Sequence, residues 1–179
     1  MSIIRGAKLQ QEIDRNEKSG RNKLRALCEQ KGDVIYHDEF FLDDRLSDED
    51  FAELGSARGK GDRPFDAIIE KSGRFYLVEI KDRGVEYERY NDYVLERQKY
   101  DHIQEWKKKL KPDGSYYCNF FENRCYMFLL EDDYITKKPG YRNSNKCTAA
   151  SRDESHKVLK PMYFLPKNHP KVKKFVLNE

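Results

Sequence analysis

The sequence predicts an α/β domain in which a mixed central sheet is flanked by helices. Two long stretches have apolar residues at helical spacing, and short runs rich in aromatic and β-branched residues lie between and after them. Their order along the chain is helix, strands, helix, strands, which is typical of helices packed on a sheet. Because 179 residues is the size of one domain, we expect a single domain over residues 1–179.

The first predicted element is a helix over residues 7–31. Gly20 lies within its apolar stripe and allows either a close approach by a neighbouring element or a break between two shorter helices. Gly32 ends the helix, and the strand-like run VIYHDEFF follows. The apolar stripe consists of Leu9, Ile13, Leu24, Leu27 and Cys28.

A long polar connection over residues 43–64 then leads to a predicted hairpin. The connection ends in the glycine- and arginine-rich sequence GSARGKGDRP, and loops of this length are commonly functional or disordered. The hairpin strands are expected at Phe65–Ile69 and Phe75–Lys81, because both runs are rich in aliphatic and aromatic residues.

A second helix is expected over Asp92–Leu110, with Leu95, Ile103 and Trp106 among the residues that face the sheet. The sequence Pro-Asp-Gly at 112–114 ends it. The remaining strands are expected in the aromatic-rich runs SYYCNFF, CYMFLLE and PMYFL and in the final FVL.

Charge and cysteine usage restrict the class of protein. The net charge is only +3, but an acidic stretch over residues 38–53 is separate from basic runs at 107–111 and 169–174, and such asymmetry can steer an anionic partner.

No run is long enough to span a membrane and no signal-peptide core is present, which favours a cytoplasmic location. Four cysteines without CxxC spacing predict free thiols, with an iron–sulfur cluster as the alternative: Cys28, Cys118, Cys125 and Cys147.

The predicted hairpin carries three charged residues near its open end. If Ser72-Gly73 forms a two-residue turn, Asp66 lies directly opposite Glu79, and Lys81 projects from the same face. Two carboxylates this close repel each other, and Mg²⁺ removes the repulsion because it prefers one or two carboxylates with waters and phosphate oxygens. A lysine beside them can orient a water or neutralise charge on phosphorus, so the pattern predicts phosphodiester hydrolysis.

A purely structural hairpin is the alternative, with Glu79 and Lys81 as an incidental same-face pair. The apolar residues Ile68 and Leu77 share the charged face, which predicts that this face is partly buried and that unpaired charge there is costly.

The motif Pro64-Phe65-Asp66 and Glu79-Ile80-Lys81, with twelve residues between the acids, resembles that of the PD-(D/E)XK nuclease superfamily. Phe65 departs from the commonest form, which has proline immediately before the aspartate. The resemblance covers roughly residues 7–110. It implies a restriction-endonuclease-like core, cleavage of DNA and less often RNA, and frequently a homodimer. It also implies that Asp66 and Glu79 bind Mg²⁺, which Mn²⁺ can replace, and that Lys81 is catalytic.

The family also supplies an acidic residue from the N-terminal helix. Glu17 falls between Leu24 and Cys28 on the inward side of the helical wheel, whereas Glu12 lies toward the flank. We therefore expect Glu17 to face inward as the additional catalytic and metal-binding acid, with Glu12 as the alternative.

Residues that contact nucleic acid are expected in two places. The basic glycine-rich loop carries Arg58, Lys60 and Arg63, which are suited to phosphates. Some family members carry a glutamine or lysine on the helix after the second motif, and Gln98 is the candidate here. Lys99, Tyr100 and His102 are alternatives on the same helix.

The resulting prediction is a Mg²⁺-dependent endonuclease that hydrolyses DNA, with branched or nicked DNA as candidate substrates. The size and single-domain layout resemble Holliday junction resolvases and small viral or phage endonucleases. Alternatives are a restriction-type or RecB-like exonuclease and a non-catalytic nucleic-acid-binding or assembly module on the same fold. A third class, a protein-interaction domain whose acidic stretch mimics DNA, predicts indifference to mutation of Glu79.

Overall fold

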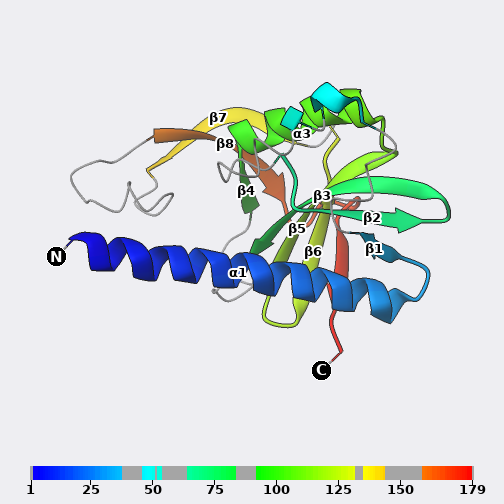
Figure 1. Ribbon diagram of the computed structural model, residues 1–179, viewed down its shortest axis with the longest axis horizontal. Coiled ribbons are helices and arrows are strands. Elements are labelled where there is room, and N and C mark those ends of the chain that lie inside the picture. Colours follow the sequence, from blue (N-terminus) through cyan, green and yellow to red (C-terminus); the bar gives the residue numbers. More distant parts are fainter. Residues whose placement is uncertain are drawn as a thin grey trace.

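The computed structural model describes residues 2–37, 46–50, 52–53, 64–83, 92–131, 135–143 and 159–178, with side chains of the first helix from residue 15 on. Within these residues the chain forms two long helices and nine strands. Figure 1 labels most of them. Their bounds are α1 Ser2–Lys31, β1 Ile35–His37, β2 Ala67–Lys71, β3 Arg74–Asp82, β4 Asp92–Glu96, α3 Arg97–Leu110, β5 Gly114–Phe121, β6 Arg124–Leu129, β7 Thr136–Asn143, β8 Leu159–Pro166 and β9 Lys173–Val176.

The main sheet has six strands in the order β1-β2-β3-β5-β6-β9. Strands β3 and β5 pair in parallel and the other neighbours are antiparallel, so the sheet is mixed, as predicted. A second sheet has the order β4-β8-β7. Its strand β4 is tied to the main sheet by Arg83, whose guanidinium donates to Asn119 Oδ1 at 2.8 Å, to the Tyr117 hydroxyl at 3.0 Å and to the Val94 carbonyl at 3.2 Å.

The two helices cover opposite faces of the hairpin β2–β3 (Figure 1). Alternating strand residues make this possible, because Val78 packs with Leu24 of α1 while Leu77 packs with Trp106 of α3. The face that carries Glu79 is therefore the α3 face. The prediction that Ile68 and Leu77 are buried beside the charges is confirmed, since both side chains are fully buried.

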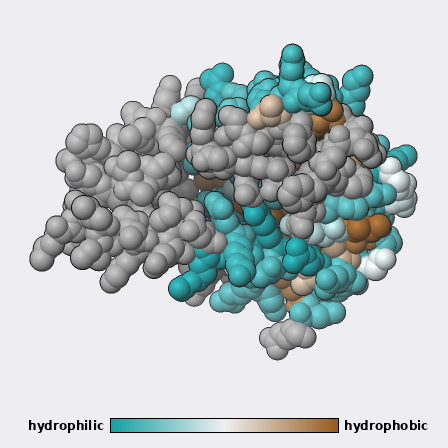
Figure 2. Space-filling model, in the orientation of Figure 1, coloured by the Kyte–Doolittle hydropathy of each residue, from teal (hydrophilic) through white to brown (hydrophobic). Residues whose placement is uncertain are grey.

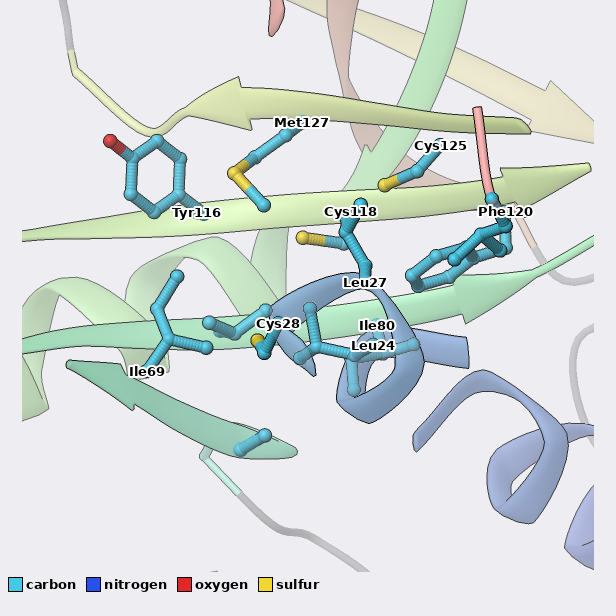
Figure 3. Close-up of a cluster of buried hydrophobic side chains, with 13 residues drawn as sticks. Leu24, Leu27, Cys28, Ile69, Ile80, Tyr116, Cys118, Phe120, Cys125 and Met127 are labelled. Atoms are coloured by element: carbon cyan, nitrogen blue, oxygen red, sulfur yellow. The ribbon is translucent and has the colours of Figure 1, made fainter. Parts of the chain in front are cut away.

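The α1 face of the sheet contains the described cysteines (Figure 3). Cys28, Cys118 and Cys125 are buried and free, and burial raises the pKa of the Cys28 thiol to about 12, so it stays neutral. The prediction that Cys28 belongs to the core is confirmed. Within the described residues no three His, Cys, Asp or Glu side chains are arranged to hold a metal ion, and Cys147 lies outside those residues.

The first helix is continuous through Gly20, so of the two predicted roles for this glycine the close approach is correct. A Cβ atom at this position would lie 2.7 Å from Ile80 Cγ2 and 3.6 Å from Asp82 Cβ. Glycine therefore lets α1 contact the end of β3 directly. No helix in the described part of the chain is both long enough and apolar enough to cross a membrane.

The predicted helix over Asp92–Leu110 is wrong in its first five residues, because Asp92–Glu96 forms β4 and the helix begins at Arg97. Leu95 is buried, but it lies in β4, where it pairs with Tyr163 of β8. Ile103 and Trp106 are buried on α3, as predicted. The strand β7 was not predicted, because its sequence TKKPGYRN is polar and contains proline.

The register of the hairpin is the predicted one. Lys71 pairs with Arg74 and Ala67 pairs with Val78, so the numbers of paired residues keep the same sum along the ladder. Ser72 and Gly73 both have positive φ, 53° and 73°, which is the conformation of a type I′ turn. The strands extend over Ala67–Lys71 and Arg74–Asp82, close to the predicted bounds.

Candidate functional site

A cavity of about 180 Å³ lies at the open end of the hairpin, where residues of α1, β3 and α3 meet. It brings together three acidic residues and two lysines that the sequence singled out, one of them, Lys99, as an alternative to Gln98. The lining residues are Asn16, Glu17, Asp66, Glu79, Ile80, Lys81, Asp82 and Lys99.

Asp66 stands just before β2 and is held by backbone groups of β3. Its N–H donates to the carbonyl of Val78 at 2.8 Å, and its Oδ2 accepts from the Ile80 N–H at 2.7 Å. On the other side, Arg21 of α1 lies 3.8 Å from Asp66 Oδ1. Asp66 is thus fixed at the cavity, with one cation near it.

Glu79 lies in the cavity as a nearly buried carboxylate, with 7% of the residue exposed. Its Oε1 is 3.5 Å from Lys99 Nζ, while its Oε2 is buried and has no hydrogen-bond partner within the part of the chain that the structure describes. Burial raises the pKa of Glu79 well above its usual value, and the negative charge of Asp66 raises it further, against opposing effects of Lys99 and Lys81. Burial and the neighbouring Asp66 therefore disfavour the charged form of Glu79.

The two lysines of the cavity differ in their surroundings. Lys81 is exposed at the end of β3, where a molecule entering from solvent meets it first. Lys99 is about two-thirds buried on α3. Burial lowers its pKa, but the charges of Glu79, Asp66 and Glu17 outweigh that effect and raise it, so Lys99 is a permanent cation of the site.

The prediction that Glu17 faces inward is wrong, because its side chain is exposed. The helical stripe predicts burial only where a sheet lies beneath the helix, and at Gly20 α1 already reaches Asp82, the last residue of β3. The N-terminal half of the helix extends beyond the sheet (Figure 1). Glu17 lines the cavity from its rim instead of its floor, and the side chain of Glu12 lies outside the described residues.

Asp82 was not predicted to take part, and the structure gives it a structural contact. Its carboxylate accepts from Ser19 Oγ at 2.7 Å and from Lys23 Nζ at 2.9 Å. Ser19 and Lys23 are one helical turn apart, so a single turn of α1 satisfies both oxygens. This cluster fastens α1 to β3 beside the cavity.

Of the residues expected to contact nucleic acid, the structure describes the position of Gln98 and its alternatives but not that of the basic loop. Gln98 is exposed and does not line the cavity, whereas its neighbour Lys99 does. The loop residues Arg58, Lys60 and Arg63 lie outside the described residues.

The donor set of the cavity suits a hard divalent cation. Mg²⁺ uses one or two carboxylates and completes its shell with waters and phosphate oxygens. Asp66, just before β2, and Glu79 of β3 supply two carboxylates, and Glu79 Oε2 is an acceptor without a hydrogen-bond partner among the described residues.

Comparison of the sequence with protein-family models and with curated proteins found no match.

Proposed function

We propose that this protein is a Mg²⁺-dependent nuclease that hydrolyses DNA phosphodiester bonds, built on a restriction-endonuclease-like core. The observation that supports it most is that Asp66 and Glu79 line one cavity at the open end of the hairpin, where Glu79 Oε2 is buried and has no hydrogen-bond partner among the described residues. A buried carboxylate oxygen that accepts no hydrogen bond destabilises a fold, and sites of this kind are often functional. The mixed sheet with a helix on either face is compatible with this core.

In this proposal Asp66 and Glu79 hold the metal ion, and Glu17 at the rim contributes through water or substrate. Mg²⁺ would supply positive charge at the phosphate oxygens and would lower the pKa of a water molecule. The protein's own side chains would position the metal, the water and the phosphate. Backbone hydrogen bonds to Asp66 keep its carboxylate in place during turnover.

Lys81 is the residue that meets the scissile phosphate. Its exposed position at the cavity allows its ammonium group to orient the attacking water and to neutralise charge that develops on phosphorus. Lys99 has a different role, because its contact with Glu79 offsets part of the negative charge of the site. We therefore expect Lys81 to affect the rate and Lys99 to affect the affinity for the metal.

The test is a cleavage panel in Mg²⁺, in Mn²⁺ and in EDTA, with supercoiled plasmid, single-stranded DNA, a four-way junction and single-stranded RNA. Glu79→Ala and Lys81→Ala are compared with Glu105→Ala and Lys108→Ala, which alter exposed residues of α3 outside the cavity. We expect metal-dependent cutting that each site variant reduces by about 100-fold or more and each control variant leaves unchanged. The preferred substrate distinguishes a junction resolvase from a nickase or an exonuclease.

Metal binding is measured separately by calorimetry with Mn²⁺ on the wild type and on Glu79→Gln. Cutting that survives Glu79→Ala would place the chemistry elsewhere. Wild-type protein that neither cuts any substrate nor binds Mn²⁺ would refute the proposal in favour of a non-catalytic binding module.

A further inference from the structure

A second, larger depression of about 550 Å³ runs along α1 beside the cavity. One wall is α1, and the other comes from the turn between β5 and β6 and from the C-terminal residues. The coloured part of α1 is hydrophilic over this region (Figure 2). The lining residues are Arg15, Lys18, Ser19, Asn22, Lys23, Ala26, Glu122, Asn123, Leu177 and Asn178, and we call this depression the α1 groove.

The α1 groove has the chemistry of a surface that binds a polyanion. Arg15 and Lys18 are exposed one turn apart on the same helix face, and Asn22 continues that face by another turn. Side-chain amides stand on both walls, where they can donate to phosphate and sugar oxygens. Glu122 is the single acidic residue among the lining residues, so cations outnumber it.

The α1 groove is continuous with the candidate site through one pair of contacts. Ser19 and Lys23 line the groove, and both hold Asp82, which lines the cavity. At 1.5 Å rise per residue, the groove side of α1 from Arg15 to Ala26 is about 16 Å long. This length matches about five nucleotide steps of a duplex strand at 3.4 Å each.

We infer that the α1 groove binds the phosphate backbone of the DNA strand next to the cleaved bond, with Arg15 and Lys18 on phosphates. This inference rests on the proposed nuclease function and names the part of the surface that its substrate occupies. The groove orients the strand so that one phosphate reaches Lys81 in the cavity. Because these contacts are to the backbone, they affect all sequences equally.

The experiment measures binding without cleavage, in the Glu79→Gln background with EDTA, by fluorescence anisotropy of a labelled DNA duplex. The groove variant is Arg15→Gln with Lys18→Gln. The matched control is Arg74→Gln with Lys71→Gln, which removes the same charges from exposed residues at the turn end of the hairpin. Affinities are taken over a series of KCl concentrations.

For two lost phosphate contacts, the slope of log K against log salt should become shallower by about 1.8. The control pair should leave the slope unchanged, and both double variants should melt at the temperature of their parent. Equal slopes for the groove variant and its parent, or an absence of DNA binding by the parent, would overturn the inference. If the wild type cuts no substrate but binds DNA in a way that depends on Arg15 and Lys18, the nuclease proposal is refuted and the groove inference stands. The two failures are therefore distinguishable.

Discussion

Glu79→Gln should stabilise the metal-free protein, although Glu79 is buried and forms an ion pair. The substitution keeps the size of the side chain and removes its charge, which lies next to Asp66 in an interior that leaves Oε2 unpartnered. A buried group without its hydrogen bond costs about 1–3 kcal/mol, and an amide in this place can donate toward the Asp66 carboxylate. The loss of the 3.5 Å contact with the partly exposed Lys99 subtracts from this gain.

The expected net gain is about 1–2 kcal/mol, which corresponds to a rise in Tm of about 2–8 °C for a domain of this size. The gain should depend on pH in a defined direction. The pKa of Glu79 is raised in the folded state, so protonation stabilises the wild type below the unfolded value of 4.5, and this contribution is lost as pH rises through the folded pKa. The difference in Tm between variant and wild type should be largest above the folded pKa of Glu79 and should shrink as pH falls through that pKa toward 4.5.

The assay is thermal unfolding in EDTA across this pH range, with exposed Glu105→Gln as the control that leaves Tm unchanged. A saturating divalent metal adds a second comparison, because a ligand at 100 times its Kd stabilises the folded state by about 2.7 kcal/mol. We expect the metal to raise the Tm of the wild type above that of Glu79→Gln. A variant less stable than the wild type at neutral pH in EDTA would refute the reasoning, since it would mean that Lys99 fully compensates Glu79.

Three further substitutions probe the surroundings of the site. Gly20→Ala should lower the free energy of unfolding by about 1–3 kcal/mol, because the new Cβ would lie 2.7 Å from Ile80 Cγ2. The urea midpoint measures this loss. The double variant Gly20→Ala/Ile80→Ala should lose less stability than the sum of the two single variants. Ser72→Asn should stabilise by about 0.5–1 kcal/mol, because asparagine tolerates the φ of 53° better than serine; an unchanged urea midpoint would contradict this. Asp82→Asn should lower the free energy of unfolding by about 1–3 kcal/mol, because it weakens the 2.9 Å contact with Lys23. This effect is opposite in sign to that of Glu79→Gln. A Tm at or above the wild-type value would count against the proposed anchoring of α1.

The hairpin could be predicted from the sequence because its geometry is local. The turn residues Ser72 and Gly73 determine which residues pair, and each further pair follows from the period of two along the strands. The ladder runs as far as Ala67 opposite Val78, and this local pairing brings the next residues, Asp66 and Glu79, to one end of the hairpin without tertiary information.

The strand β4 could not be predicted in the same way, because its partner is distant. Residues Asp92–Glu96 pair with Met162–Pro166, about seventy residues later in the chain. A run with Tyr93, Val94 and Leu95 is compatible with either a helix or a strand until the partner is known. The adjoining helical pattern of α3 favoured extending the helix backwards.

The preference for Gln98 over its alternative Lys99 overlooked a usable pattern. Ile103, Trp106 and Leu110 form the buried stripe of α3, and Lys99 is four residues before Ile103, on the same stripe. Gln98 is one residue off that stripe and therefore points to solvent. A charged residue on the inward stripe of a helix that packs against an E-x-K strand is the pattern that would have identified it.

The distribution of charge at the site favours function over stability as the reason for its residues. Asp66 and Glu79 line the same cavity, just beyond Ala67 and Val78, the last pair of the β2–β3 ladder. Their cations come from two different helices, Arg21 of α1 for Asp66 and Lys99 of α3 for Glu79. An apolar pair at these positions would extend the neighbouring core and avoid the desolvation of four charges, so stability alone would select it. Glu79 with an unpartnered oxygen is a local conflict in an otherwise consistent hairpin, and such conflicts are expected where a ligand completes the structure.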